Sequence, residues 1–121
     1  MRRVIFSLVL LMAATGIQAQ KISHIETTRS WHYVYDDKGK KVHTFSTSQG
    51  EVVAYSDTFY IVKHGSWYYT YDAKGKKLYT FSQSSVGEVL NAAGDTFTSR
   101  KGSWIYTWDK KGKKIATRSA H

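Results

Sequence analysis

The chain has 121 residues, a net charge of +9 and 15% aromatic residues, which is enough for one domain and too little for two. It contains neither proline nor cysteine, so a thiol nucleophile, a disulfide framework and a cysteine-held metal site are excluded. The many aromatic and β-branched residues exclude a disordered low-complexity chain. The composition therefore indicates a small folded domain that is stabilised by packing alone.

The first 19 residues have the pattern of a signal peptide. Arg2 and Arg3 precede an apolar run over 4–14, and Ile17-Gln18-Ala19 offers a cleavage site. The run is about half the length of a membrane-spanning helix, and no cysteine follows it to carry a lipid. We therefore expect a signal peptide at 1–19 and export from a bacterial cell, to the periplasm or beyond, without a lipid anchor. The mature chain, 20–121, has no transmembrane segment and carries a charge of +7 once Arg2 and Arg3 are removed.

The mature chain is built from an internal repeat. Ten of 17 positions are identical in three segments, which are Ser30–Ser46 (SWHYVYDDKGKKVHTFS), Ser66–Ser82 (SWYYTYDAKGKKLYTFS) and Ser103–Ser119 (SWIYTWDKKGKKIATRS). The tryptophans that open these segments are 36 and 37 residues apart. This spacing predicts a single repeat-built β domain with units at about 21–56, 57–94 and 95–121.

Each unit reads as short strands joined by tight turns. Apolar and polar residues alternate from Trp67 to Tyr71, and the Asp72–Gly75 segment has the residues of a hairpin turn. We expect Asp72 to pair with Lys76, which sets Trp67 opposite Phe81, Tyr69 opposite Tyr79 and Thr70 opposite Leu78. About four strands per unit give eleven in all. The predicted fold is an all-β antiparallel meander, and a β-trefoil or prism, a propeller-like arrangement and a rolled sheet remain open.

The segment from Asp72 to Leu78 resembles the D-x-x-G-K-x-V half of WG-type β-repeats. Tyr71-Asp72 followed by Gly75 is also similar to the YD-type repeats of cell-surface shells. Each likeness covers about ten residues per unit. A WG repeat has glycine after tryptophan, and a YD repeat has its branched residue one place earlier. The resemblance implies a β-repeat architecture and no functional residue.

Lysines recur at the three hairpin turns, and we call these turns the lysine tips. They are Lys38, Lys40 and Lys41, then Lys74, Lys76 and Lys77, then Lys110, Lys111, Lys113 and Lys114. A hairpin turn needs aspartate and glycine for its shape, so these lysines are candidate ligands for an anionic partner. The competing interpretation is that they only keep exposed turns soluble. If rotation relates the units, all three tips gather at one end of the domain.

An aromatic stripe occupies one face of the first strand in each segment. It comprises Trp31, Tyr33 and Tyr35, then Trp67, Tyr69 and Tyr71, then Trp104, Tyr106 and Trp108. The first interpretation is that the stripe is core. The opposite face also carries apolar residues, so the alternative is an exposed stripe whose rings stack on sugars or bases. Trp31, Trp67, Trp104 and Trp108 are therefore candidate ligand-binding residues.

The other chemistry-bearing residues indicate neither catalysis nor a metal site. Acidic residues fall at turns or repeat between units, and no histidine recurs among the copies. His32 and His43 are expected on opposite strand faces, where they cannot share a ligand. The third unit departs from the repeat at Arg118, Trp108 and Ala116, which is typical of a terminal cap.

These observations predict an exported, non-catalytic binding module without cofactor or metal. Its expected partner is an anionic or sugar-rich polymer, such as an acidic polysaccharide or lipopolysaccharide, or an acidic protein surface. The alternative is a structural or protein-interaction component of the cell envelope that assembles through sheet edges, including as a homo-oligomer. A small hydrolase is the least favoured reading.

Overall fold

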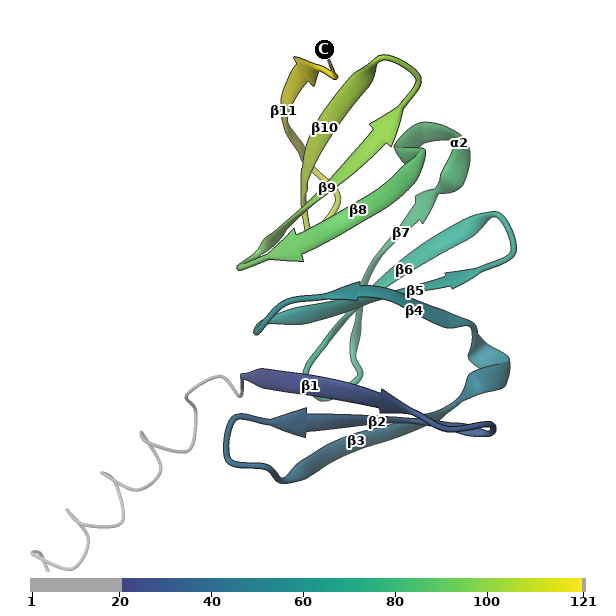
Figure 1. The fold of residues 1–121 in the computed structure, drawn as a ribbon, viewed down its shortest axis with the longest axis vertical. Helices are drawn as coiled ribbons and strands as arrows, with labels where there is room; N and C mark the ends of the chain where they lie inside the picture. The colour runs from purple at the N-terminus through teal and green to yellow at the C-terminus, as the bar shows by residue number, and fades with distance from the viewer. Residues whose placement is uncertain (1–20, 121) are drawn as a thin grey trace, which may run out of the picture.

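The computed structural model describes residues 21–120, which form three antiparallel β-sheets stacked one on the next (Figure 1). The predicted signal peptide lies outside these residues. The sheets have three, four and four strands, and within each sheet consecutive strands of the chain pair with each other. Eleven strands in antiparallel meanders confirm the predicted fold class. Because each sheet is built from consecutive strands, as in propeller blades, the blade-like alternative is the one that this topology matches.

The strands are five or six residues long. The first sheet contains β1 (Ile22–Thr27), β2 (Trp31–Asp36) and β3 (Lys41–Ser46). The second contains β4 (Glu51–Tyr55), β5 (Phe59–His64), β6 (Trp67–Asp72) and β7 (Lys77–Ser82). The third contains β8 (Glu88–Ala93), β9 (Thr96–Lys101), β10 (Trp104–Asp109) and β11 (Lys114–Ser119).

Two short helices carry the chain from one sheet to the next. They are η1 (Thr47–Gln49) and α2 (Gln83–Val86), and each begins at a serine whose hydroxyl accepts a backbone N–H. The sheets therefore change at these helices, and β8 opens the third sheet although the predicted frame placed its residues in the second unit. Within residues 21–120, the first sheet has no counterpart of β4 and β8.

The predicted register is right at the turn and wrong beyond it. The N–H of Asp72 donates to Lys76 O at 2.9 Å, as expected. Lys77 still faces Tyr71, but Leu78 is then left out of the ladder by a bulge, so Thr70 faces Tyr79 and Tyr68 faces Phe81. The bulge adds one residue to one strand. A one-residue slip moves every later side chain to the other face.

The faces between consecutive sheets form the core. The first and second sheets meet at a cluster that contains Val34, Phe45, Tyr60 and Val62. The second and third meet at a larger cluster, which contains Phe59, Ile61, Tyr68, Phe81, Val86, Phe97 and Trp108. The aromatic stripe of the second and third sheets therefore points toward the preceding sheet. In the first sheet the stripe shares the outer end face with His24 and Glu26.

The second and third lysine tips dock on the sheet before them. A Cβ added at Gly75 would collide with the His43 ring, and one added at Gly112 would lie 2.6 Å from the Tyr79 ring. Both glycines also have positive φ. Each of these tips therefore approaches a ring on the last strand of the preceding sheet as closely as a glycine allows, which fixes how far apart consecutive sheets lie.

The two end faces of the stack are more polar than the buried ones. His24 and Glu26 of β1 occupy the places that Tyr60 and Val62 occupy in β5. At the other end, all six residues of β11 are exposed, including Arg118 in the place of Phe81. The expectation of a terminal cap in the third unit is confirmed, and the first sheet carries a cap of its own.

Replacing Gly75 by alanine should destabilise the protein more than replacing Gly39. Both glycines have similar φ, 87° and 80°, so both variants lose about 1–2 kcal/mol to the left-handed backbone. Nothing lies within 4 Å of a Cβ at Gly39, whereas the His43 ring blocks one at Gly75. We expect a further loss of about 1–3 kcal/mol for Gly75→Ala from overpacking, measured by denaturant unfolding of 20–121. Equal losses in the two variants would show that tip docking does not hold the sheets together.

Stability should fall when the pH rises above about 10. Burial raises the pKa of Tyr60 above its ordinary value of 10.0, and the nearby Tyr71 and Asp72 add to the shift. The unfolded chain therefore loses this proton first, and the stability present below pH 10 is lost as the pH rises toward the folded-state value. Tyr60→Phe should keep the ring stacking and flatten this alkaline decline. Unfolding free energies at pH 9, 10 and 11 test it, and an unchanged slope would be evidence against a buried neutral phenol.

Candidate functional site

The shape of the lysine tips depends on their backbone. In the first tip, Asp36 Oδ1 accepts the N–H groups of Lys38 and Lys40 at 2.9 and 2.8 Å. In the second, Asp72 Oδ1 accepts those of Lys74 and Lys76 at 2.9 Å. The side chains of these four lysines are exposed and contribute nothing to the turn.

All three tips lie on the same side of the stack, one tip in each sheet (Figure 1). The third follows the same plan, because Asp109 Oδ1 accepts the N–H of Lys111. The tips are therefore spread along the stack as a row of positive charge. The second and third tips each contact the preceding sheet.

Not every predicted lysine is free to bind a partner. Lys41, Lys77 and Lys114 place their Nζ atoms 4.2, 4.9 and 4.2 Å from the ring centroids of Tyr33, Tyr69 and Tyr106. These cation–π contacts repeat once per sheet and occupy one ring face of each tyrosine. The available lysines of the row are therefore Lys38, Lys40, Lys74, Lys76, Lys111 and Lys113.

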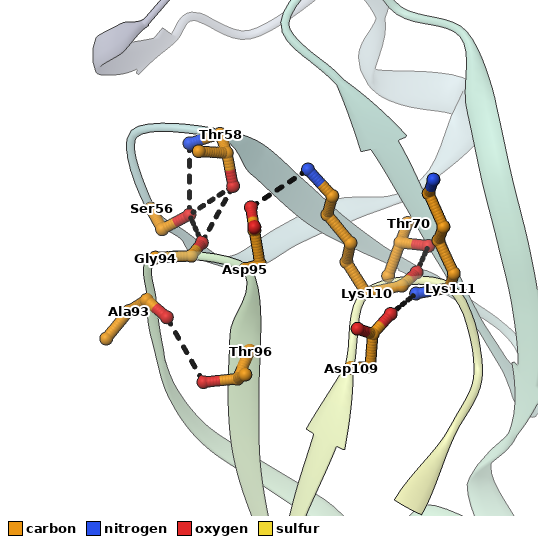
Figure 2. Close-up of polar contacts among 10 residues, drawn as sticks. All are labelled: Ser56, Thr58, Thr70, Ala93, Gly94, Asp95, Thr96, Asp109, Lys110 and Lys111. Atoms are coloured by element: carbon orange, nitrogen blue, oxygen red, sulfur yellow. Dashed lines mark hydrogen bonds and ion pairs between the residues drawn. The ribbon is translucent and has the colours of Figure 1, made fainter. Parts of the chain in front are cut away.

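Lys110 joins two turns of the third sheet and also touches the second (Figure 2). Its Nζ lies 3.0 Å from Asp95 Oδ1, and this hydrogen bond from Lys110 lowers the pKa of the Asp95 carboxyl. Its backbone oxygen accepts the Thr70 hydroxyl at 2.7 Å. Beside it, Ser56 and Thr58 donate to Gly94 O at 2.6 and 2.7 Å. Lys110 is therefore part of the contact between sheets rather than of the free row.

Three of the four predicted tryptophans form a second row. Trp31, Trp67 and Trp104 open β2, β6 and β10, and their exposed fractions are 46%, 48% and 48%. We call them the tryptophan row. The turns before these strands lie on the side of the stack opposite the lysine tips (Figure 1). The two candidate surfaces are therefore separated by the length of a strand.

The fourth tryptophan belongs to the core. Trp108 is 8% exposed, and its Nε1–H donates to Ser99 Oγ at 2.9 Å. It packs edge-on against Phe81. The prediction that Trp108 binds a ligand is thus at odds with its position, because the slipped register brings Phe81 to the face that Trp108 covers.

Basic residues flank the tryptophan row, and they were not among the predicted site residues. Arg29 lies in the turn before Trp31. Before the other two tryptophans, the basic residues are the last two of a strand: Lys63 and His64 in β5, and Arg100 and Lys101 in β9. Trp67 pairs directly with His64, and Trp104 with Lys101. The signal was present in the sequence, because the residue before the Gly-Ser pair is basic in both later turns.

A cleft of about 330 Å³ lies between the second and third sheets near the tryptophan row. Glu51, Lys63, Tyr68 and Glu88 are among its lining residues. Burial raises the pKa of Tyr68, whose hydroxyl donates to Gly87 O at 2.8 Å. Glu51 and Glu88 are repeat-related, and Glu51 stands opposite Lys63 in the ladder of β4 and β5.

The predicted placement of two histidines is wrong. His32 pairs with Phe45, and His43 pairs with Val34, so both histidines share the face toward the second sheet. His32 is buried, with Nε2 2.8 Å from Gly50 O and Nδ1 2.8 Å from Thr27 Oγ1. Both of its ring nitrogens are thus occupied. Within residues 21–120, no group of three histidine, aspartate or glutamate side chains is arranged to hold a metal ion.

Over the same residues, no helix is long and apolar enough to span a membrane. Neither the family models nor the curated proteins contain a match to this chain. The likeness to WG-type and YD-type repeats therefore stays a resemblance of sequence pattern.

Proposed function

We propose that the protein is an exported, non-catalytic module that binds an extended anionic or sugar-rich polymer. The observation that carries the proposal is the row of lysine tips. Their turns are formed by aspartate, glycine and backbone atoms, while six exposed ammonium groups have no role in the fold. Repeated charges at one sheet spacing, about 10 Å, suit a polymer that lies along the stack.

The tryptophan row supports a contribution from sugar stacking. Trp31, Trp67 and Trp104 are about half exposed, although an indole gains more by complete burial. Flat aromatic faces beside basic side chains are suited to acidic sugars, because the ring stacks and the cation pairs with a carboxylate or sulfate. Each site is weak alone, so affinity depends on several units engaging one polymer.

Neutralising the lysine tips should abolish salt-sensitive binding. The variant is Lys40→Gln, Lys76→Gln and Lys113→Gln in 20–121, tested for retention on polygalacturonate and on lipopolysaccharide across a salt series. Binding driven by counterion release weakens steeply with salt, so we expect a lower affinity and a shallower salt dependence than for the unchanged protein.

The matched control removes the same charge at the opposite end of the strands, through Arg29→Gln, Lys63→Gln and Lys101→Gln. It should keep most of the retention on polygalacturonate. Equal losses in the two triple variants would mean that net charge alone drives binding and would contradict a lysine-tip surface.

Replacing the tryptophan row should weaken binding of neutral glycans with little effect on folding. Trp67→Ala should lower affinity for a soluble β-glucan about fivefold, because stacking on one ring contributes about 1 kcal/mol. Trp67→Ala with Trp104→Ala should lose more than the sum of single effects if the units act together. Intrinsic fluorescence titration measures both. A glycan that neither quenches the fluorescence nor distinguishes the variants would exclude the tryptophan row as a sugar platform.

A further inference from the structure

In the part of the chain that the structure describes, the first sheet lacks the strand that opens each of the other two sheets. β4 and β8 begin with the same Glu-Val pair after a glycine, and each pairs with the strand that follows it. β1 is the counterpart of β5 and β9, yet it is the edge strand of its sheet among the described residues. We propose that the outer edge of β1 is a docking site for an extended segment of a partner protein, which adds there as a fourth strand.

The backbone of β1 presents the groups that such a strand needs. The N–H of Thr28 donates to Trp31 O at 2.8 Å, and hydrogen-bonded pairs recur at every second residue of an antiparallel ladder. The N–H and C=O groups of Ile25 and Thr27 therefore point away from β2, toward the open edge. A row of unpaired edge groups is a template for strand addition.

The second sheet shows what pairs with these positions. Ile61 and Lys63 of β5 correspond to Ile25 and Thr27, and they face Ala54 and Glu51 of β4. The third sheet repeats the arrangement with Thr98 facing Asn91 and Arg100 facing Glu88. An added strand would therefore meet β1 in a register that this chain already uses twice.

Apolar side chains of β4 cover the position beside β1 where the added strand would lie. Val52 and Tyr55 lie on the face of β4 that is directed toward the first sheet, because they pair with Val62 and Tyr60 of that face. The other face of β4 packs closely on β8, but no strand of the first sheet makes a comparable contact with β4. Tyr55 is consequently 38% exposed. The position beside β1 is thus bounded by the backbone edge of β1 and by apolar side chains of β4, just as strands inside the stack are bounded by a neighbouring strand and an apolar face.

Among residues 21–120, no segment supplies the missing strand. β4 starts eight residues before β5, and β8 starts eight residues before β9. The same spacing before β1 gives residues 14–18, which belong to the predicted signal peptide. A second copy stacked in the same direction would bring its own β4 over the first copy's β1, where β5 already lies.

The occupant is therefore an isolated extended segment of another protein. By analogy with β4 and β8 it begins with an acidic residue and carries small apolar side chains toward the stack, as Val89 and Ala92 do. The positive charge of the mature chain favours such an acidic segment.

The test uses 20–121 and a synthetic peptide with the sequence of residues 50–58, GEVVAYSDT. Amide hydrogen exchange, followed residue by residue by NMR, should slow at least tenfold at Ile25 and Thr27 when the peptide is added. The amide of Glu26, which points toward β2, should be unaffected. A control peptide with prolines at the third and fifth positions should have no effect, since proline cannot donate to the ladder. Unchanged exchange at Ile25 and Thr27 with the first peptide would overturn the proposal.

Two variants distinguish docking of a strand at β1 from nonspecific peptide binding. Tyr55→Glu places a charge in the apolar side of the site and should weaken peptide binding at least tenfold. Ile115→Glu changes a residue that is 52% exposed on the third sheet, and it should leave binding unchanged. Equal weakening in both variants would contradict a site at β1.

Two further outcomes would also overturn the proposal, because they identify another occupant. Protection of Ile25 and Thr27 in the uncleaved 1–121 chain without peptide would assign the place to the chain's own N-terminal segment. Concentration-dependent protection of the same amides in 20–121, together with a doubled mass, would assign it to a second copy.

Discussion

Face-to-face packing of consecutive sheets is the interaction on which the rest of the structure depends. A sheet of three or four short strands with apolar residues on both faces is not stable alone in water. The second sheet shows the consequence most clearly, because four consecutive residues of β5, Phe59 to Val62, are buried. Alternate residues belong to the cluster with the first sheet and to the cluster with the third. No disulfide holds the sheets together, so the spacing set by Gly75 and Gly112 governs how well both clusters pack.

The repeat allowed much of the fold to be predicted from sequence. Strand number, the antiparallel order and the Asp72–Lys76 turn all follow from local chemistry, and local chemistry is repeated three times here. The register beyond the turn does not follow, because whether Leu78 pairs or bulges depends on which face must be buried. The error at this one residue propagated to the face of Phe81 and, in the first unit, to the relation between His32 and His43.

The candidate site was predicted in part. The lysine tips were identified because their spacing is visible in the sequence, but their partners were not. A lysine that lies over a tyrosine, as Lys41 does over Tyr33, cannot be told from a free one by its position in the repeat. The same holds for tryptophan. Trp104 and Trp108 lie four residues apart on one face of β10. Trp104 is exposed at the edge of the stack, whereas Trp108 is buried against Phe81 of the second sheet, and the repeat pattern alone does not show this difference.

The outer units end the stack, because their outer faces are polar. The second sheet has apolar residues on both faces. The face that it turns to the third sheet is much like the face that the first sheet turns to it. Duplication of about 37 residues between the existing linkers would therefore lengthen the protein without requiring a new kind of interface. Addition of a unit beyond Arg118 or before His24 would have to bury charge. The stack can therefore be lengthened by units inserted between its two end sheets. Each inserted unit would add one lysine tip and one tryptophan to the two rows.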